Sequence, residues 1–234
     1  HQSNTSEQEK TTTDVWRATL SPMRTRVVEA LYSGYYFDMT AGSQKVVICV
    51  AGLTACGKST AARRLAERFR LKYVSGGTAL KELALKQGYK AKERGWWESA
   101  EGMRFLEQRA HDPRFDKQID AELLEQAAQG NIVLDSWTMP WLSKTGFKIW
   151  LEVSTMERAR RLTRRDGISF EKAMQIIEEK DSRTKQIYKS TYGFNLGEDY
   201  SPFDLVLDAE RLSSDEVFDI LSFVVERLAL KQRR

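Results

Sequence analysis

Residues 52–59 read Gly-Leu-Thr-Ala-Cys-Gly-Lys-Ser, which fits the phosphate-loop pattern Gly-x-x-x-x-Gly-Lys-Ser. The two glycines allow backbone angles that turn successive N–H groups inward onto phosphate oxygens. Lys58 supplies a cation for the β- and γ-phosphates, and the Ser59 hydroxyl is a Mg²⁺ ligand. The pattern therefore predicts binding of ATP, or another nucleoside triphosphate, with Mg²⁺. The predicted nucleotide-binding residues are Gly52, Leu53, Thr54, Ala55, Cys56, Gly57, Lys58, Ser59 and Thr60.

The elements around this loop support the prediction. Residues 46–51 are a short, continuous apolar run, which is typical of a parallel strand buried on both faces. Residues 58–69 have the pattern of an amphipathic helix, whose positive dipole end would point at the bound phosphates. Cys56 fits the loop as a small residue, or as a redox-sensitive thiol near the helix end.

A second predicted strand ends in a carboxylate residue. Residues 131–135 end in Asp135, which would hold Mg²⁺ through water or orient an acceptor hydroxyl. An acid at a strand end can also serve a plain turn. After a phosphate loop in an α/β chain, we favour the catalytic interpretation.

Arginines share one face of the predicted helix at residues 155–165. Arg158, Arg161 and Arg165 recur at i, i+3 and i+7. Guanidinium groups on one face suit a transferring phosphoryl group, whose charge spreads over several oxygens. The alternative is a solvated basic helix. Beside a phosphate loop, we interpret them as catalytic.

Strands and helices alternate along the rest of the chain, which predicts an α/β fold with a covered sheet. Further strands are expected at 71–74, 147–153 and 203–207, helix-rich sequence at 78–129, and helices near 170–192 and 215–230. Residues 1–13 are interpreted as a disordered leader and residues 14–44 as a helical arm. That arm would pack on the main domain, residues 45–234, or serve docking or oligomerisation.

Composition sets broad limits on the function. Apolar residues make up 41% of the 234 residues and charged residues 30%, with a formal net charge of +4, an ordinary balance for a core-forming protein. This mild charge does not indicate nucleic-acid binding. Two cysteines form neither a disulfide framework nor a zinc site. No apolar run is long enough to span a bilayer, so we expect a cytoplasmic protein, monomeric or homodimeric.

With these segments placed, residues 45–230 resemble the archaeal-type cytidylate kinase-like branch of the nucleoside monophosphate kinase family. Only the phosphate loop is specific by itself; the order and spacing of the other segments add to it. Those segments are residues 71–77, 130–135, 147–151, 157–167, 187–193 and 201–207.

The resemblance implies a P-loop NTPase fold with a five-stranded parallel sheet flanked by helices. It also implies a helical acceptor-binding region at about residues 75–129 and an arginine-rich lid at about 158–192. Lid closure would exclude water, so that phosphate passes to the acceptor.

Departures from the family pattern concern the acceptor. The family's Glu-Gly-Arg after the third strand appears here as Asp135-Ser136-Trp137. An arginine expected early in the acceptor region appears as Lys81, and one expected late in the lid falls at Ile187, with Arg183 one turn away. An aspartate that the family has near the Lys81 position is Thr78 in this chain. A pair of arginines expected on the third acceptor helix is replaced by Ala121 and Glu122.

Four tryptophans lie in or beside the expected acceptor side: Trp96, Trp97, Trp137 and Trp141. They could stack on a base, or they could pack in the core. Trp137 is the strongest candidate because it follows Asp135 at a strand's carboxyl end, where ligands of α/β proteins bind. Together with Lys81 and Arg183, it is a predicted substrate-binding residue.

These observations favour a kinase that transfers the γ-phosphoryl group of MgATP to a small acceptor. The resemblance implies a pyrimidine nucleoside monophosphate: CMP, dCMP or UMP. The missing arginines leave room for a different small molecule, either a non-nucleotide hydroxyl compound or another phosphate. A nucleotide-binding regulatory or RNA-associated protein is the third hypothesis.

Overall fold

The computed structural model describes residues 45–90 and 95–229, which belong to one compact unit. The leader expected at residues 1–13 and the arm expected at residues 14–44 lie outside the described residues. Within the described ranges, no helix combines the length and apolar character needed to cross a membrane.

A sheet of five strands, all pairs parallel, forms the centre of the unit in the order β2-β3-β1-β4-β5. The five-stranded parallel sheet predicted from the sequence is confirmed. Its strands are β1 (Val47–Ala51), β2 (Lys72–Ser75), β3 (Ile132–Asp135), β4 (Phe147–Glu152) and β5 (Leu205–Asp208). Strands β1 and β3 are buried along their whole length, as expected for apolar strands covered on both faces.

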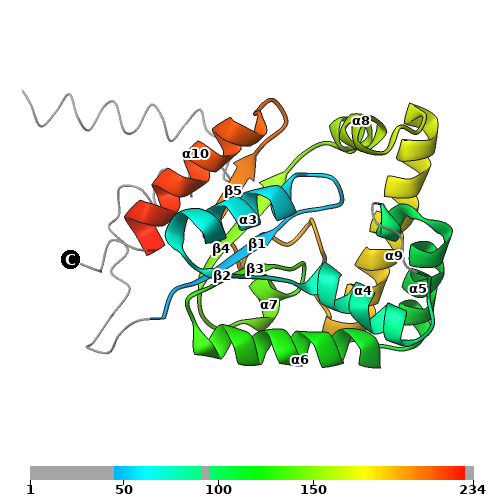
Figure 1. The fold of residues 1–234 in the computed structure, drawn as a ribbon, viewed down its shortest axis with the longest axis horizontal. Helices are drawn as coiled ribbons and strands as arrows, with labels where there is room; N and C mark the ends of the chain where they lie inside the picture. Colours follow the sequence, from blue (N-terminus) through cyan, green and yellow to red (C-terminus); the bar gives the residue numbers. More distant parts are fainter. Residues whose placement is uncertain (1–44, 91–94, 230–234) are drawn as a thin grey trace, which may run out of the picture. The chain divides into compact units, whose positions relative to one another are not determined.

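Helices cover both faces of the sheet (Figure 1). Helices α3 (Lys58–Phe69) and α10 (Ser214–Val224) lie side by side on one face, and α6 (Arg114–Gln129) and α7 (Met139–Leu142) contact the other. Beyond the sheet edge, α9 (Phe170–Tyr192) packs against α5 (Ala100–His111) and α8 (Thr155–Asp166). The remaining elements are α4 (Gly76–Lys86), the 3₁₀ turn η1 (Trp96–Glu98) and the π-helical turn η2 (Val225–Ala229).

Serines mark the beginnings of five of these helices. Each accepts a hydrogen bond from an N–H of the first turn, which otherwise has no helical partner. They are Ser75, Ser99, Ser154, Ser169 and Ser213. Helix α3 is different, because its cap is Gly57 and no side chain bonds its first N–H groups. That end of α3 is therefore open to an external anion.

Two apolar clusters hold the helices that surround this open end. One joins the sheet to α4, α5 and α6 through Phe105, Leu123 and Leu134. The other joins Trp150 of β4 to Ile187 and Tyr188 of α9. The helix expected over residues 215–230 is shorter than predicted: regular α-helix ends at Val224, and the π-helical turn follows.

Candidate active site

The phosphate loop joins β1 to α3 and has the backbone that its glycines predict. Gly52, Ala55 and Gly57 have φ angles of 149°, 64° and 101°. A Cβ on Gly52 would lie 2.6 Å from Cys56 Sγ and 2.7 Å from Leu151 O, so only glycine fits there. A Cβ on Gly57 would meet nothing within 4 Å, so its glycine is required by the φ angle alone.

Cys56 is a packing residue of this loop. Its side chain is 2% exposed, and burial raises the pKa of the thiol above its usual value. A protonated, buried thiol is a poor nucleophile. The small-residue interpretation of Cys56 is therefore favoured over the redox-sensitive one.

Trp137 ties the segment after β3 to the phosphate loop. Its indole Nε1 donates to the Gly52 carbonyl at 2.5 Å, and its ring centroid lies 5.1 Å from Lys58 Nζ. The Trp137 ring and the Lys58 ammonium group are therefore in contact at the phosphate loop. Sequence reasoning placed Trp137 on the acceptor, whereas the structure shows that its polar atom is engaged by the loop.

Asp135 ends β3 next to the loop. The carboxylate is 3% exposed and accepts a hydrogen bond of 3.0 Å from Tyr73 Oη. Asp135 and Ser59 both line one cavity of about 500 Å³, together with Lys58. The structure thus brings these two predicted site residues to one cavity.

The far wall of this cavity comes from α5, α6 and α9. Arg109 and Asp116 form a buried ion pair at 2.6 Å, and Arg109 also donates to Tyr188 Oη at 3.3 Å. Asp120 accepts from Thr138 Oγ1 and Tyr192 Oη, each at 2.5 Å. The sequence predicted an acceptor-binding region over residues 75–129 but none of these individual residues.

Two signals in the sequence could have found the far wall. Lys180, Thr184 and Tyr188 are spaced i, i+4 and i+8 on α9, and all three line the cavity. Asp116 and Asp120 interrupt the buried stripe of α6, and a carboxylate on such a stripe requires a partner. By contrast, Ala121 and Glu122, the positions where the family pattern has arginines, are exposed on α6.

Glu98 links the η1 turn to α8 and α9 at the side of the cavity. It contacts Lys180 Nζ at 2.6 Å and Arg165 Nη2 at 2.9 Å. Burial works against its ionisation, but Lys180 and Arg165 hold the pKa of Glu98 below its usual value. Arg165 also lines the cavity, so the structure brings this predicted residue to the site.

Arg158 does not reach the cavity, which differs from the catalytic role predicted for it. Its side chain is 3% exposed, and its guanidinium donates to Thr54 O at 3.2 Å and to Asp181 at 2.6 Å. The residue lies behind the phosphate loop. It therefore positions the loop from within the protein, and the predicted contact with a transferring phosphoryl group is not supported.

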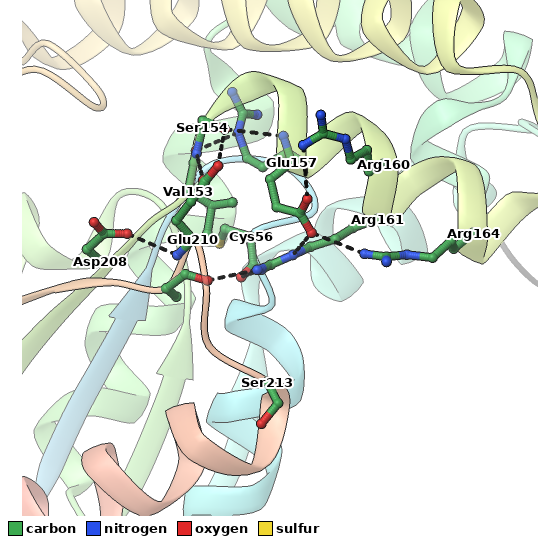
Figure 2. A network of polar contacts seen from close by, with 12 residues as sticks. Cys56, Val153, Ser154, Glu157, Arg160, Arg161, Arg164, Asp208, Glu210 and Ser213 are labelled. Carbon is green, nitrogen blue, oxygen red and sulfur yellow. Dashed lines mark hydrogen bonds and ion pairs between the residues drawn. The ribbon is translucent and has the colours of Figure 1, made fainter.

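Arg161 connects three parts of the site (Figure 2). It donates to Cys56 O at 3.0 Å, to Ala209 O at 2.8 Å and to Glu157 at 3.3 Å. Glu157 also contacts Arg160 and Arg164, so that one carboxylate orders three arginines of α8. Arg161 lines the main cavity and also a second cavity of about 430 Å³.

The predicted substrate-binding residues do not all lie at the same site. Lys81 lines the main cavity. Arg183 lines neither of the two cavities; it points along α9 to Glu179 at 2.8 Å and toward Glu107. Trp97 lines the cavity, whereas Trp141 stacks on Phe194 at 4.1 Å in the core.

Comparison with known proteins agrees with this geometry. The sequence model described as the cytidylate kinase-like family matches residues 47–211. The chain is a member of the cytidylate kinase-like family. It is 30% identical over 185 residues to the cytidylate kinase of Pyrococcus horikoshii, covering 79% of this chain and 90% of that protein. It is 34% identical over 189 residues to that of Pyrobaculum calidifontis, covering 80% and 96%.

The match includes both the phosphate loop and the helices of the far wall. The cytidylate kinase of Methanopyrus kandleri is similarly close, at 32% identity over 197 residues, covering 80% of this chain and 96% of that protein. Membership of the cytidylate kinase-like family makes the chain a P-loop kinase, a nucleotide-binding phosphotransferase.

This cytidylate kinase-like chain fits a bound polyphosphate. Thr54 Oγ1, at the loop, is buried and has no hydrogen-bond partner among the described residues. The first-turn N–H groups of α3 lack a side-chain cap. In the described ranges, no cluster of three or more His, Cys, Asp or Glu could hold a metal. Ser59 and Asp135, which line the same cavity, would hold Mg²⁺ together with water and the phosphates.

Proposed function

We propose that this protein transfers the γ-phosphoryl group of ATP to a pyrimidine nucleoside monophosphate, with CMP as the principal acceptor. One observation carries the proposal: a single cavity has the phosphate loop and Asp135 at one end and a polar, aromatic wall at the other. Two substrates bound side by side in one cavity are held in position to react with each other. The cytidylate kinase-like relatives support this choice of acceptor.

At the donor end, the loop amides and Lys58 hold the β- and γ-phosphates. Ser59 and Asp135 hold Mg²⁺ with them, and the bound cation supplies positive charge to the phosphate oxygens. Arg161 and Arg165 line the same space and stabilise charge on the transferred group. Arg158 acts indirectly, because it fixes the Thr54 carbonyl of the loop.

The second cavity suits the base of the donor nucleotide. It shares Gly57, Thr60 and Arg161 with the main cavity, so a nucleotide held by the loop can extend into it. Its other side is formed by residues 210–214, before and at the start of α10. ATP therefore spans both cavities, with its phosphates at Gly57.

Trp137 favours a second candidate, a kinase for a small alcohol. It stands where the family pattern has an arginine for the acceptor phosphate, and its indole N–H is bonded to Gly52 O instead. An alcohol acceptor must lose a proton, and Asp135 is the group placed to take it. A phosphate acceptor is already anionic near neutral pH and needs no such base.

An acceptor panel tests the proposal. ADP release is coupled to an indicator reaction with CMP, dCMP, UMP, AMP and a set of small alcohols, and products are identified by chromatography. We expect efficient formation of CDP. If no nucleoside monophosphate supports turnover, the proposal is wrong. Turnover with an alcohol alone, abolished by Asp135→Asn, would establish the second candidate.

A further inference from the structure

Asp120 is a carboxylate built into the far wall of the cavity. It lies on α6, is 6% exposed and lines the cavity that also contains Lys58 and Asp135. Its two oxygens accept from different hydroxyls, Oδ1 from Thr138 and Oδ2 from Tyr192. Each oxygen keeps a second lone pair for another donor.

The position of Asp120 suits the distant end of an acceptor. Thr138 lies three positions after Asp135, so their Cα atoms are at most roughly 10 Å apart. Thr138 in turn bonds to Asp120. The Asp120 carboxylate therefore lines the same cavity as Asp135 and is linked through Thr138 to the segment that follows β3.

Independent features show that this wall is built for a flat, polar ligand. Thr184 also lines the cavity; it is 1% exposed, and its Oγ1 has no hydrogen-bond partner among the described residues. The rings of Trp97 and Tyr188 line the same space. Arg109 connects them, since it donates to Tyr188 and lies 5.6 Å from the Trp97 ring centroid.

Several groups bear on the protonation of Asp120. Burial raises the pKa of its carboxyl to about 6, while the hydroxyls of Thr138 and Tyr192 lower it. Asp116, which lies on the same helix as Asp120, raises the pKa of Asp120, and Arg109 of α5 lowers it. Asp116 is already paired with Arg109. At neutral pH the carboxylate is therefore ionised and presents acceptors only.

We propose that Asp120 selects cytosine over uracil in the acceptor by accepting a hydrogen bond from the exocyclic amino group of the base. This inference rests on the proposed function and adds a specificity-determining residue to it. Uracil has a carbonyl oxygen where cytosine has the amino group. Two acceptors would then face each other, and a buried acceptor without a donor is costly.

The assignment has a pH signature. Below its pKa, Asp120 carries a proton and can donate to the uracil carbonyl, so the preference for CMP shrinks. Above it, the preference reaches its full value. The acceptor phosphate also titrates near about pH 6, but it is the same in CMP and UMP and cancels in their ratio.

The test measures kcat/KM for CMP, dCMP and UMP between about pH 5 and pH 8. We expect the CMP-to-UMP ratio to rise with a midpoint near pH 6, the pKa of Asp120. In Asp120→Asn, the side chain can donate as well as accept. The ratio should then fall roughly ten- to a hundredfold and lose its pH dependence.

Two further variants keep the test sharp. Tyr192→Phe removes a hydroxyl that lowers the pKa of Asp120, so the midpoint of the ratio should move to higher pH. Glu122→Gln changes an exposed acid on the same helix and should leave the ratio and its midpoint unchanged. A merely structural Asp120 would lower both kcat/KM values together and shift no midpoint.

The outcomes separate this inference from the proposed function. Turnover of CMP with an unchanged CMP-to-UMP ratio in Asp120→Asn would overturn the inference alone. If Asp120→Asn instead loses its discrimination between CMP and dCMP, the carboxylate binds the sugar. That result would also overturn the inference. Absence of turnover with every pyrimidine monophosphate would reject the proposed function, and the inference with it.

Discussion

The indole Nε1 of Trp137 donates to the carbonyl of Gly52 at 2.5 Å, which joins the end of β3 to the first glycine of the phosphate loop. The same ring lies against Lys58 at 5.1 Å. One side chain from the segment after β3 thus contacts two residues of the phosphate loop. Trp137 therefore links the position of that segment to the shape of the loop.

Trp137→Phe should weaken donor binding more than it weakens the fold. Phenylalanine keeps a ring near Lys58 but leaves the Gly52 carbonyl without its donor, at a cost of about 1–3 kcal/mol. Because that carbonyl belongs to the loop, we expect the Kd for MgATP to rise several-fold to tenfold. Isothermal titration with a non-hydrolysable MgATP analogue measures the change.

Trp141→Phe is the matched control. Its indole also donates one hydrogen bond, of 3.1 Å, but the acceptor is Asp199 and not the loop, and its ring stacks on Phe194. It should lose similar stability and bind the analogue normally. Equal analogue affinities in the two variants would show that Trp137 does not shape the loop.

Removing the Arg158 guanidinium should act on stability. Arg158→Met leaves the carboxylate of Asp181, which is 11% exposed, without its cation, and should destabilise the fold by about 3–5 kcal/mol. Chemical denaturation measures this loss. Adding Asp181→Asn should recover part of it, because the uncompensated buried charge is then gone.

Arg161→Met provides the contrast. Arg161 is 23% exposed and lines the cavity, so its loss should reduce kcat strongly with a smaller effect on stability. A stable Arg158→Met protein whose kcat falls as far as that of Arg161→Met would restore the catalytic role that the sequence suggested for Arg158.

Asp120 should make the fold less stable as pH rises. Its folded pKa of about 6 lies above the usual value of 3.8, so the folded state binds the proton more tightly than the unfolded state. Stability contributed by the protonated form is present below pH 4 and is lost as pH rises toward 6. At neutral pH, Asp120→Asn should therefore raise the free energy of unfolding by on the order of 1–3 kcal/mol.

Urea unfolding at about pH 4 and pH 7.5 measures this difference. The gain from Asp120→Asn should be present at the higher pH and nearly absent at the lower one. Glu122→Gln, on the exposed side of α6, is the control. A gain that is the same at both pH values would contradict a raised pKa for Asp120.

Local sequence predicted the donor half because its chemistry is local. The phosphate loop needs glycine at two fixed positions, and those positions have the predicted positive φ angles. Asp135 follows directly from the strand that precedes it. The apolar run of β1 predicted a buried parallel strand, and the full five-stranded parallel sheet was implied by the family resemblance.

The acceptor half depends on contacts between distant segments, which spacing alone does not reveal. Arg158 and Arg161 share a helix face, yet Arg158 turns to Thr54, 104 residues earlier, while Arg161 reaches the cavity. Arg183 was chosen by its nearness to an expected arginine, but helix α9 presents Lys180 and Thr184 to the cavity instead. The family pattern pointed to a different residue of α9 from those that line the cavity.

The central claim is that the phosphate loop holds ATP while its γ-phosphoryl group is transferred to an acceptor in the adjoining cavity. Substitution of Lys58 tests this claim most directly. Formation of CDP from MgATP and CMP is measured for the native protein, Lys58→Ala and the exposed control Lys86→Ala. The account predicts equal amounts of ADP and CDP from the native and control proteins, and a fall of at least about a hundredfold in Lys58→Ala. CDP formation by Lys58→Ala at the native rate would contradict it.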